Sequence, residues 1–177
     1  MRRTPASSSS ADAVARELAA LGAQLAASRS AQVGSGFTDV EEADLLVRSD
    51  PNAFLIGVLF TQGIPAERAW AAPFGLLERL GHLDPARLGR EPDAVARAVA
   101  SAPALHRFKH TLARWVSGAG SRIESSWGGD AARMWPDGAD LRDVTGRLLE
   151  FDGIGRKKAA MAVEILRRHF GVRLLST

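Results

Sequence analysis

An all-α fold is predicted for this chain of 177 residues. No segment alternates apolar and polar residues as a half-buried strand does, and apolar residues instead recur at helical spacing. The signals that start and stop helices are also clear. Asp50-Pro51 and Asp84-Pro85 each place a capping aspartate before a proline at the first helical position, and Gly81 follows a helical segment as a stop signal.

The chain is expected to divide into an N-terminal extension and one multi-helix domain. Residues 1–37 combine a serine-rich tail that is expected to be disordered, a marginal helix at residues 12–27, and a Ser/Gly linker. Residues 38–177 are expected to form the domain, which opens with a capping box of Thr38 and Glu41. Its other helices are predicted at residues 52–62, from Pro65, from Pro73 to Gly81, from Pro85, and at residues 93–100, 105–124, 141–150 and 156–170.

Composition narrows the class of protein. Apolar residues make up 46% and charged residues 24% of the chain, which is typical of a globular domain. No apolar run reaches membrane-spanning length, and no signal peptide is recognisable, so a cytoplasmic location without membrane contact is expected. The chain has no cysteine, which excludes disulfides, thiolate zinc sites and an iron–sulfur cluster within these residues.

Positive charge gathers in the C-terminal part of the chain. Residues 1–102 hold 10 Lys or Arg and 12 Asp or Glu, whereas residues 103–177 hold 13 and 8. Residues 156–173 carry six of these cations against one acid, Glu164. A polyanion partner explains such a basic region, and so does a genome that favours arginine and alanine; charge alone does not separate the two.

The most informative segment is residues 151–159, Phe-Asp-Gly-Ile-Gly-Arg-Lys-Lys-Ala. A helix is predicted to end before it, Gly153-Ile154-Gly155 permits a tight turn, and a second helix begins at once. Backbone N–H groups at the start of that helix are unpaired and form an anion site, to which Arg156 and Lys158 add charge. The inferred ligand is a DNA phosphate. A dinucleotide fingerprint is excluded because Lys158 stands at its third glycine, whereas an ordinary turn between two helices remains an alternative.

This segment resembles the hairpin of the helix-hairpin-helix (HhH-GPD) DNA glycosylases of the endonuclease III superfamily, Leu-Pro-Gly-Val-Gly-Arg-Lys-Thr-Ala. Two upstream blocks are also similar to the family: residues 54–62, Phe-Leu-Ile-Gly-Val-Leu-Phe-Thr-Gln, and residues 103–109, Pro-Ala-Leu-His-Arg-Phe-Lys. The resemblance covers residues 50–171. It implies a helical glycosylase domain that binds duplex DNA as a monomer, flips out a damaged or mispaired base and cleaves its N-glycosidic bond.

The resemblance assigns roles to individual residues. Gln62 would fill the space that the flipped base vacates, Lys109 would contact the DNA backbone, and Lys157 falls where bifunctional members carry their Schiff-base lysine. Arg156, Lys158 and the helix N-terminus would favour the neutral amine of Lys157, although Lys157 as one more phosphate contact is the alternative. Family hairpins often hold Na+ or K+ through backbone carbonyls, so such an ion is expected here.

One family feature is missing from the chain. The catalytic aspartate of the family lies beyond the second hairpin helix, where this sequence ends at Thr177, and no Asp or Glu here carries over to its role. We therefore expect either a C-terminally truncated glycosylase, in which an iron–sulfur cluster would lie beyond Thr177, or a short member with altered chemistry. A non-catalytic DNA-binding protein and a helical domain without DNA binding remain alternatives. His106 and His110 lack a third ligand, so no metal site is expected.

Overall fold

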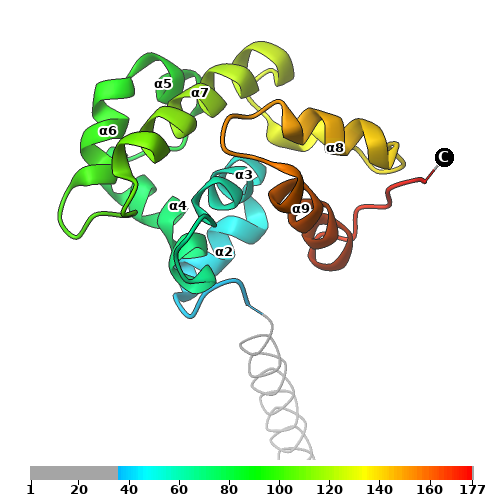
Figure 1. Ribbon diagram of the computed structural model, residues 1–177, viewed down its shortest axis with the longest axis horizontal. Helices are drawn as coiled ribbons and strands as arrows, with labels where there is room; N and C mark the ends of the chain where they lie inside the picture. The colour runs from blue at the N-terminus through cyan, green and yellow to red at the C-terminus, as the bar shows by residue number, and fades with distance from the viewer. Residues whose placement is uncertain (1–35, 177) are drawn as a thin grey trace, which may run out of the picture. The chain divides into compact units, whose positions relative to one another are not determined.

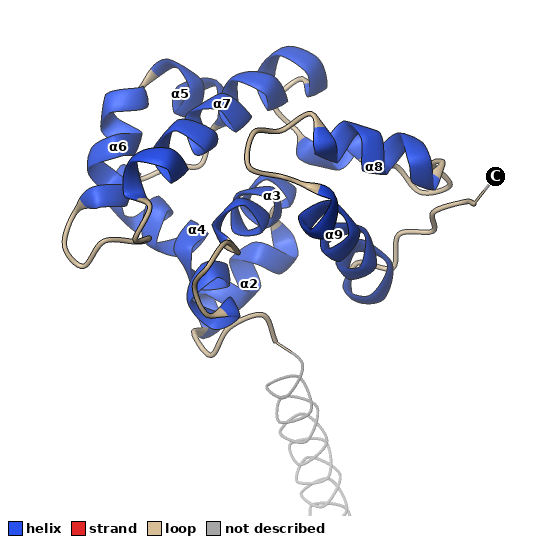
Figure 2. Ribbon diagram, in the orientation of Figure 1, coloured by secondary structure: helices blue, strands red, loops and turns tan. Residues whose placement is uncertain are grey.

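The computed structural model describes residues 36–176 (Figure 1), and the predicted tail, helix and most of the linker lie outside this range. The described residues form helices and loops without a strand (Figure 2), which confirms the all-α prediction. None of these helices is both long and apolar enough to cross a membrane. The elements are α2 (Glu41–Ser49), α3 (Pro51–Phe60), α4 (Ala66–Leu80), α5 (Pro85–Arg90), α6 (Pro92–Ala100), α7 (Lys109–Trp127), the 3-10 helix η1 (Ala131–Met134), α8 (Leu141–Leu149) and α9 (Arg156–His169).

Helix α3 is the centre of the core. Every residue from Ala53 to Phe60 is buried, as expected for a helix that is apolar on all sides, and α3 packs against α2, α4, α7 and η1. Its N-terminus is capped by Asp50, whose carboxylate accepts from the N–H groups of Asn52 at 2.8 Å and Ala53 at 3.3 Å, as predicted. Asn52 in turn donates to the Gly129 carbonyl at 3.0 Å, which ties the helix start to the segment after α7.

The predicted capping box at Thr38 is wrong. Helix α2 begins at Glu41 after Val40 without a side-chain cap, and the Thr38 hydroxyl accepts from Val40 N–H at 3.4 Å. The reason lies in Phe37, which the sequence analysis assigned to the linker. Its ring is buried with its centroid 4.9 Å from that of Trp70, and its N–H donates to the Asp44 carboxylate at 2.6 Å.

Two other helix boundaries differ from the predictions. Pro73 does not start a helix but lies buried inside α4, because packing beside Gly57 and Trp70 of the core outweighs the lost backbone hydrogen bond. Helix α7 begins at Lys109 rather than at Leu105, whose N–H instead donates to the Val99 carbonyl at 3.0 Å.

Glycine permits the close approach of α5 and α7. A Cβ atom added at Gly120 would lie 2.7 Å from Leu88 Cβ and 2.7 Å from the Pro85 carbonyl oxygen. A Cβ added at Gly89 would lie 2.9 Å from the backbone nitrogen of Ser121. Since backbone atoms cannot move aside without shifting a helix, both positions require glycine.

Gly120→Ala is expected to lower the free energy of unfolding by roughly 2 kcal/mol or more, because the new methyl group overpacks the α5–α7 contact. Gly118→Ala, in the same helix, meets no atom within 4 Å and should raise it by roughly 0.5–1 kcal/mol. Chemical denaturation of both variants measures the difference. Equal effects of the two substitutions would contradict the close approach.

Candidate nucleic-acid interface

Helices α8 and α9 are joined by the tight turn that the sequence predicted. Asp140 caps α8, accepting from Arg142 N–H at 2.7 Å and from Asp143 N–H at 3.3 Å. In the turn, the Ile154 N–H donates to the Phe151 carbonyl at 3.0 Å, and both of these side chains are buried. Ile154 is therefore fixed by its side chain, and only its backbone is available to a ligand.

The fold requires glycine at position 153 of the turn but not at position 155. Gly153 has a φ of 86°, and an added Cβ would overlap the indole of Trp115, so both the backbone and the packing require glycine. Gly155 has a φ of −89°, which any residue adopts, and an added Cβ would meet no atom within 4 Å. The fold explains the first glycine and leaves the second open to a ligand-based reason.

The N-terminus of α9 is open to an anion. Gly155 is its N-cap without a side-chain hydrogen bond, and within residues 36–176 no acceptor pairs with the N–H groups of Arg156, Lys157 and Lys158. Arg156 and Lys157 are exposed beside these groups. Unpaired N–H groups and adjacent cations form the arrangement that binds phosphate.

The Lys158 side chain contacts α3 rather than the N-terminus of α9. Its ammonium donates to the Leu59 carbonyl of α3 at 2.7 Å and lies 5.3 Å from the ring centroid of Trp115. The side chain is partly buried, and this burial lowers the pKa of Lys158 from its ordinary value of 10.5 to about 8. The predicted phosphate contact of Lys158 thus has a competing partner, and the exposed Lys157 makes no hydrogen bond to any other described residue.

His106 is a second contact at the same end of α3. Its ring is fully buried, and Nδ1 accepts from Phe108 N–H at 3.0 Å. That bond leaves the proton on Nε2, which donates to the Gln62 carbonyl at 2.8 Å. Desolvation, the main cause, lowers the pKa of His106, and the charge of Lys158 contributes to the same direction. A neutral histidine therefore fixes the backbone of Gln62.

The three blocks of the sequence resemblance meet at this place. Gln62 follows the C-terminal end of α3, the loop before α7 supplies His106, and α9 supplies Lys158; Figure 1 shows α9 next to α3. The loop is also held by Arg79, which donates to the carbonyl of Ala98 at 2.6 Å and to that of Pro103 at 2.7 Å. Blocks far apart in the sequence thus form one rigid group.

The exposed surface of this group is polar and positively charged. Gln62 is exposed, and Lys109 is partly buried as the first residue of α7. Phe108 is 45% exposed, with the Arg107 guanidinium 4.6 Å from its ring centroid. Sequence reasoning missed Arg107. It also missed the bond from His106 to Gln62, because these two residues are 44 positions apart in the sequence.

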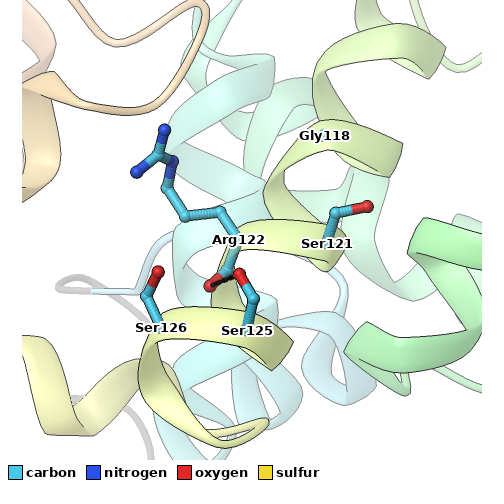
Figure 3. Close-up of a pocket in the computed structure, with 5 residues that line it drawn as sticks. All are labelled: Gly118, Ser121, Arg122, Ser125 and Ser126. Atoms are coloured by element: carbon cyan, nitrogen blue, oxygen red, sulfur yellow. Dashed lines mark hydrogen bonds between the residues drawn. The ribbon is translucent and has the colours of Figure 1, made fainter.

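A shallow hollow of about 300 Å³ lies on α7, away from these residues. Figure 3 shows its lining side chains on successive turns, with Arg122 among serines; the residues are Gly118, Ser121, Arg122, Ser125 and Ser126. A smaller hollow of about 110 Å³ continues toward the turn, where Arg122 pairs with Glu150 at 2.9 Å. Both hollows are too open and polar to enclose a flipped base.

Candidate ligands for a metal ion are backbone oxygens of the turn. The carbonyls of Asp152, Gly153 and Ile154 accept no hydrogen bond from other described residues, so they are free to hold a monovalent cation. No three His, Asp or Glu side chains within residues 36–176 lie close enough to form a metal site.

Comparison with known proteins gave no match. No family model fits the sequence, and neither a curated protein nor a solved structure is similar to it.

Acid is expected to destabilise the fold through His106. Because its pKa in the folded state lies below the unfolded value of about 6.5, the unfolded state binds the proton more tightly, and the free energy of unfolding should fall as pH drops below about 6.5. Denaturant titrations between about pH 7 and pH 5 measure this slope. His106→Asn, which keeps an acceptor for Phe108 N–H, should flatten it, and an unchanged slope would contradict the buried neutral ring.

Alkali is expected to stabilise the fold through Lys158. Its folded pKa of about 8 lies below the ordinary 10.5, so the penalty for burying its charge is present below pH 8 and disappears as pH rises toward 10.5. The free energy of unfolding should increase by roughly 1–3 kcal/mol over this range. The measurement is clean, since the chain has no tyrosine or cysteine and only three lysines. Lys158→Met should abolish the increase, whereas Lys157→Met should not.

Proposed function

We propose that the chain is a base-excision DNA repair glycosylase that acts as a monomer on damaged or mispaired bases in duplex DNA. The observation that carries the proposal is the meeting of the three family-like blocks at the end of α3, through the bonds of His106 to Gln62 and of Lys158 to Leu59. In a DNA complex the N-terminus of α9 would bind a backbone phosphate and Gln62 would fill the vacated space. A monovalent cation on the turn carbonyls would support the phosphate contact.

The turn between α8 and α9 has the features that a phosphate contact requires. Phosphate contacts fix register without reading sequence, and they need backbone N–H groups that the DNA can approach closely. The exposed Gly155 provides that access, while the buried Phe151 and Ile154 hold the turn rigid. The resemblance adds an abasic-site lyase step through a lysine Schiff base, for which it selects Lys157.

The test compares Gly155→Ala with Gly146→Ala on duplexes that carry a panel of lesions. Neither added methyl group meets an atom within 4 Å. Gly146→Ala, inside α8, should melt like the parent protein or slightly above it, and Gly155→Ala, at the N-cap of α9, slightly below it, so both proteins stay folded in the assay. Only Gly155→Ala is expected to weaken duplex binding, by about tenfold or more, because its methyl group blocks the phosphate. Fluorescence anisotropy at several salt concentrations measures the affinity, and Arg156→Ala should reduce the salt slope by about one.

Base release is then scored on the same duplexes. Duplex binding that depends on Gly155, together with release of one damaged or mispaired base, supports the glycosylase proposal. Binding without release of any base would replace the proposal with the non-catalytic DNA-binding protein. No binding at low salt would leave a helical domain whose turn has no ligand.

A further inference from the structure

Gly118 is an exposed glycine inside α7 that the fold does not explain. Its φ is not positive, and a Cβ added there would meet no atom within 4 Å. Glycine inside a helix is less stable than alanine, so a reason for it is expected. The close approach of α5 provides that reason for Gly120, but no described residue provides one for Gly118. The space in front of Gly118 is therefore open to a ligand.

The larger hollow on α7, which Gly118 lines, is surrounded by hydrogen-bond donors. These are the hydroxyls of Ser121, Ser125 and Ser126 and the guanidinium of Arg122 (Figure 3). The hydroxyls of Ser121 and Ser126 form no hydrogen bond with other described residues, and that of Ser125 donates to the Arg122 carbonyl at 3.4 Å. No carboxylate and no large apolar side chain lines this hollow, so its chemistry favours an anion that accepts hydrogen bonds.

The guanidinium of Arg122 has donors to spare. Its Nη1 donates to the Glu150 carboxylate at 2.9 Å, and its carbon lies 5.8 Å from the ring centroid of Phe151. The two side chains of the ion pair are 41% and 53% exposed, and such a pair is weak in water. The other N–H groups of Arg122 donate to no described residue. Arg122 can therefore bind an anion beside Glu150 or in its place.

The hollow continues toward the turn that precedes α9. The smaller hollow connects Gly118 and Arg122 with Glu150, Phe151 and Asp152. A DNA strand carries a phosphate at every nucleotide, so a strand with one phosphate at the N-terminus of α9 presents others to the adjoining surface. The two acidic side chains line the smaller hollow alone, which leaves the larger hollow as the place for such a phosphate.

We propose that the larger hollow on α7 binds a second backbone phosphate of the DNA strand that α9 holds. The inference rests on the proposed function and extends its DNA contact along α7. The serine hydroxyls and Arg122 donate to the phosphate oxygens, and Gly118 lets the phosphate approach the helix closely. Such a contact adds affinity and fixes the register of the strand without reading its sequence.

The first test compares Gly118→Gln with Gly146→Gln, which adds the same side chain to an exposed glycine of α8. No described atom crowds either position, and glutamine favours a helix more than glycine does, so both variants should fold. Only Gly118→Gln fills the hollow, and it is expected to weaken binding of the lesion-bearing duplexes by about fivefold or more. Fluorescence anisotropy of the full chain measures both affinities, and equal values would overturn the inference.

The ion pair of Arg122 and Glu150 gives a second test, in which the two variants have opposite effects. Arg122→Gln should lower the duplex affinity and reduce the salt slope by about one, whereas Glu150→Gln frees the guanidinium and should raise the affinity about twofold or more. Arg87 and Glu91 form an exposed pair of 3.0 Å on α5, outside the hollow, and serve as the matched control. Arg87→Gln and Glu91→Gln make the same changes of charge and should alter the affinity by less than about twofold.

A pair that only supports the fold would give a different result. Arg122→Gln and Glu150→Gln would then both lower the melting temperature and the affinity, and this outcome would overturn the inference. Gly155→Ala tells the inference and the proposed function apart. If it weakens duplex binding while the variants at Gly118 and Arg122 do not, the contact on α7 is overturned and the phosphate contact of α9 remains. Absence of duplex binding by the parent protein would remove both.

Discussion

The interaction on which the candidate site depends is the pairing of the C-terminal carbonyls of α3. A helix leaves its last carbonyls without intrahelical donors, and α3 is buried from Ala53 to Phe60, so water does not supply them freely. The hydroxyl of Thr61 donates to Val58 at 2.7 Å and Lys158 donates to Leu59, and just beyond the helix His106 donates to Gln62. Two of the three donors come from distant parts of the chain. Folding of the core therefore brings the loop before α7 and the start of α9 to one place.

This way of completing a helix has an electrostatic consequence. Only polar groups can donate hydrogen bonds to the carbonyls at the end of α3. Polar side chains must therefore lie inside or beside the core, where each of them is partly desolvated. Desolvation disfavours the charged form, which lowers the pKa of Lys158 and of His106 alike. The same contacts that satisfy the helix thus favour the neutral form of the histidine and lower the pKa of the lysine to about 8.

The sequence predicted the elements whose signals are local. The Asp50 cap, the glycine stop at Gly81 and the turn between α8 and α9 depend on neighbouring residues, and all three are present. The partial burial of Lys158 at the start of α9 also has a signal in the sequence. Lys158 lies four residues before the buried Ala162 and so flanks the buried face, whereas Lys157 lies on the exposed side. The burial of Pro73 and the clamp by His106 depend on long-range packing, for which a single sequence holds no local signal.

Charge along α9 gives a further reason to expect an anion. At its C-terminal end, Arg168 pairs with Glu164. Arg167 and Arg168 lie in the last turn, where positive charge interacts favourably with the negative end of the helix dipole. At its N-terminal end the first turn has no acidic residue, and Arg156 and Lys157 add positive charge to the positive end of the dipole. Positive charge at this end lowers the stability of the free protein, since the N-terminus of a helix favours negatively charged side chains. A bound phosphate would be attracted both by these cations and by the positive end of the dipole, so the arrangement that weakens the free helix is the one that strengthens an anion complex.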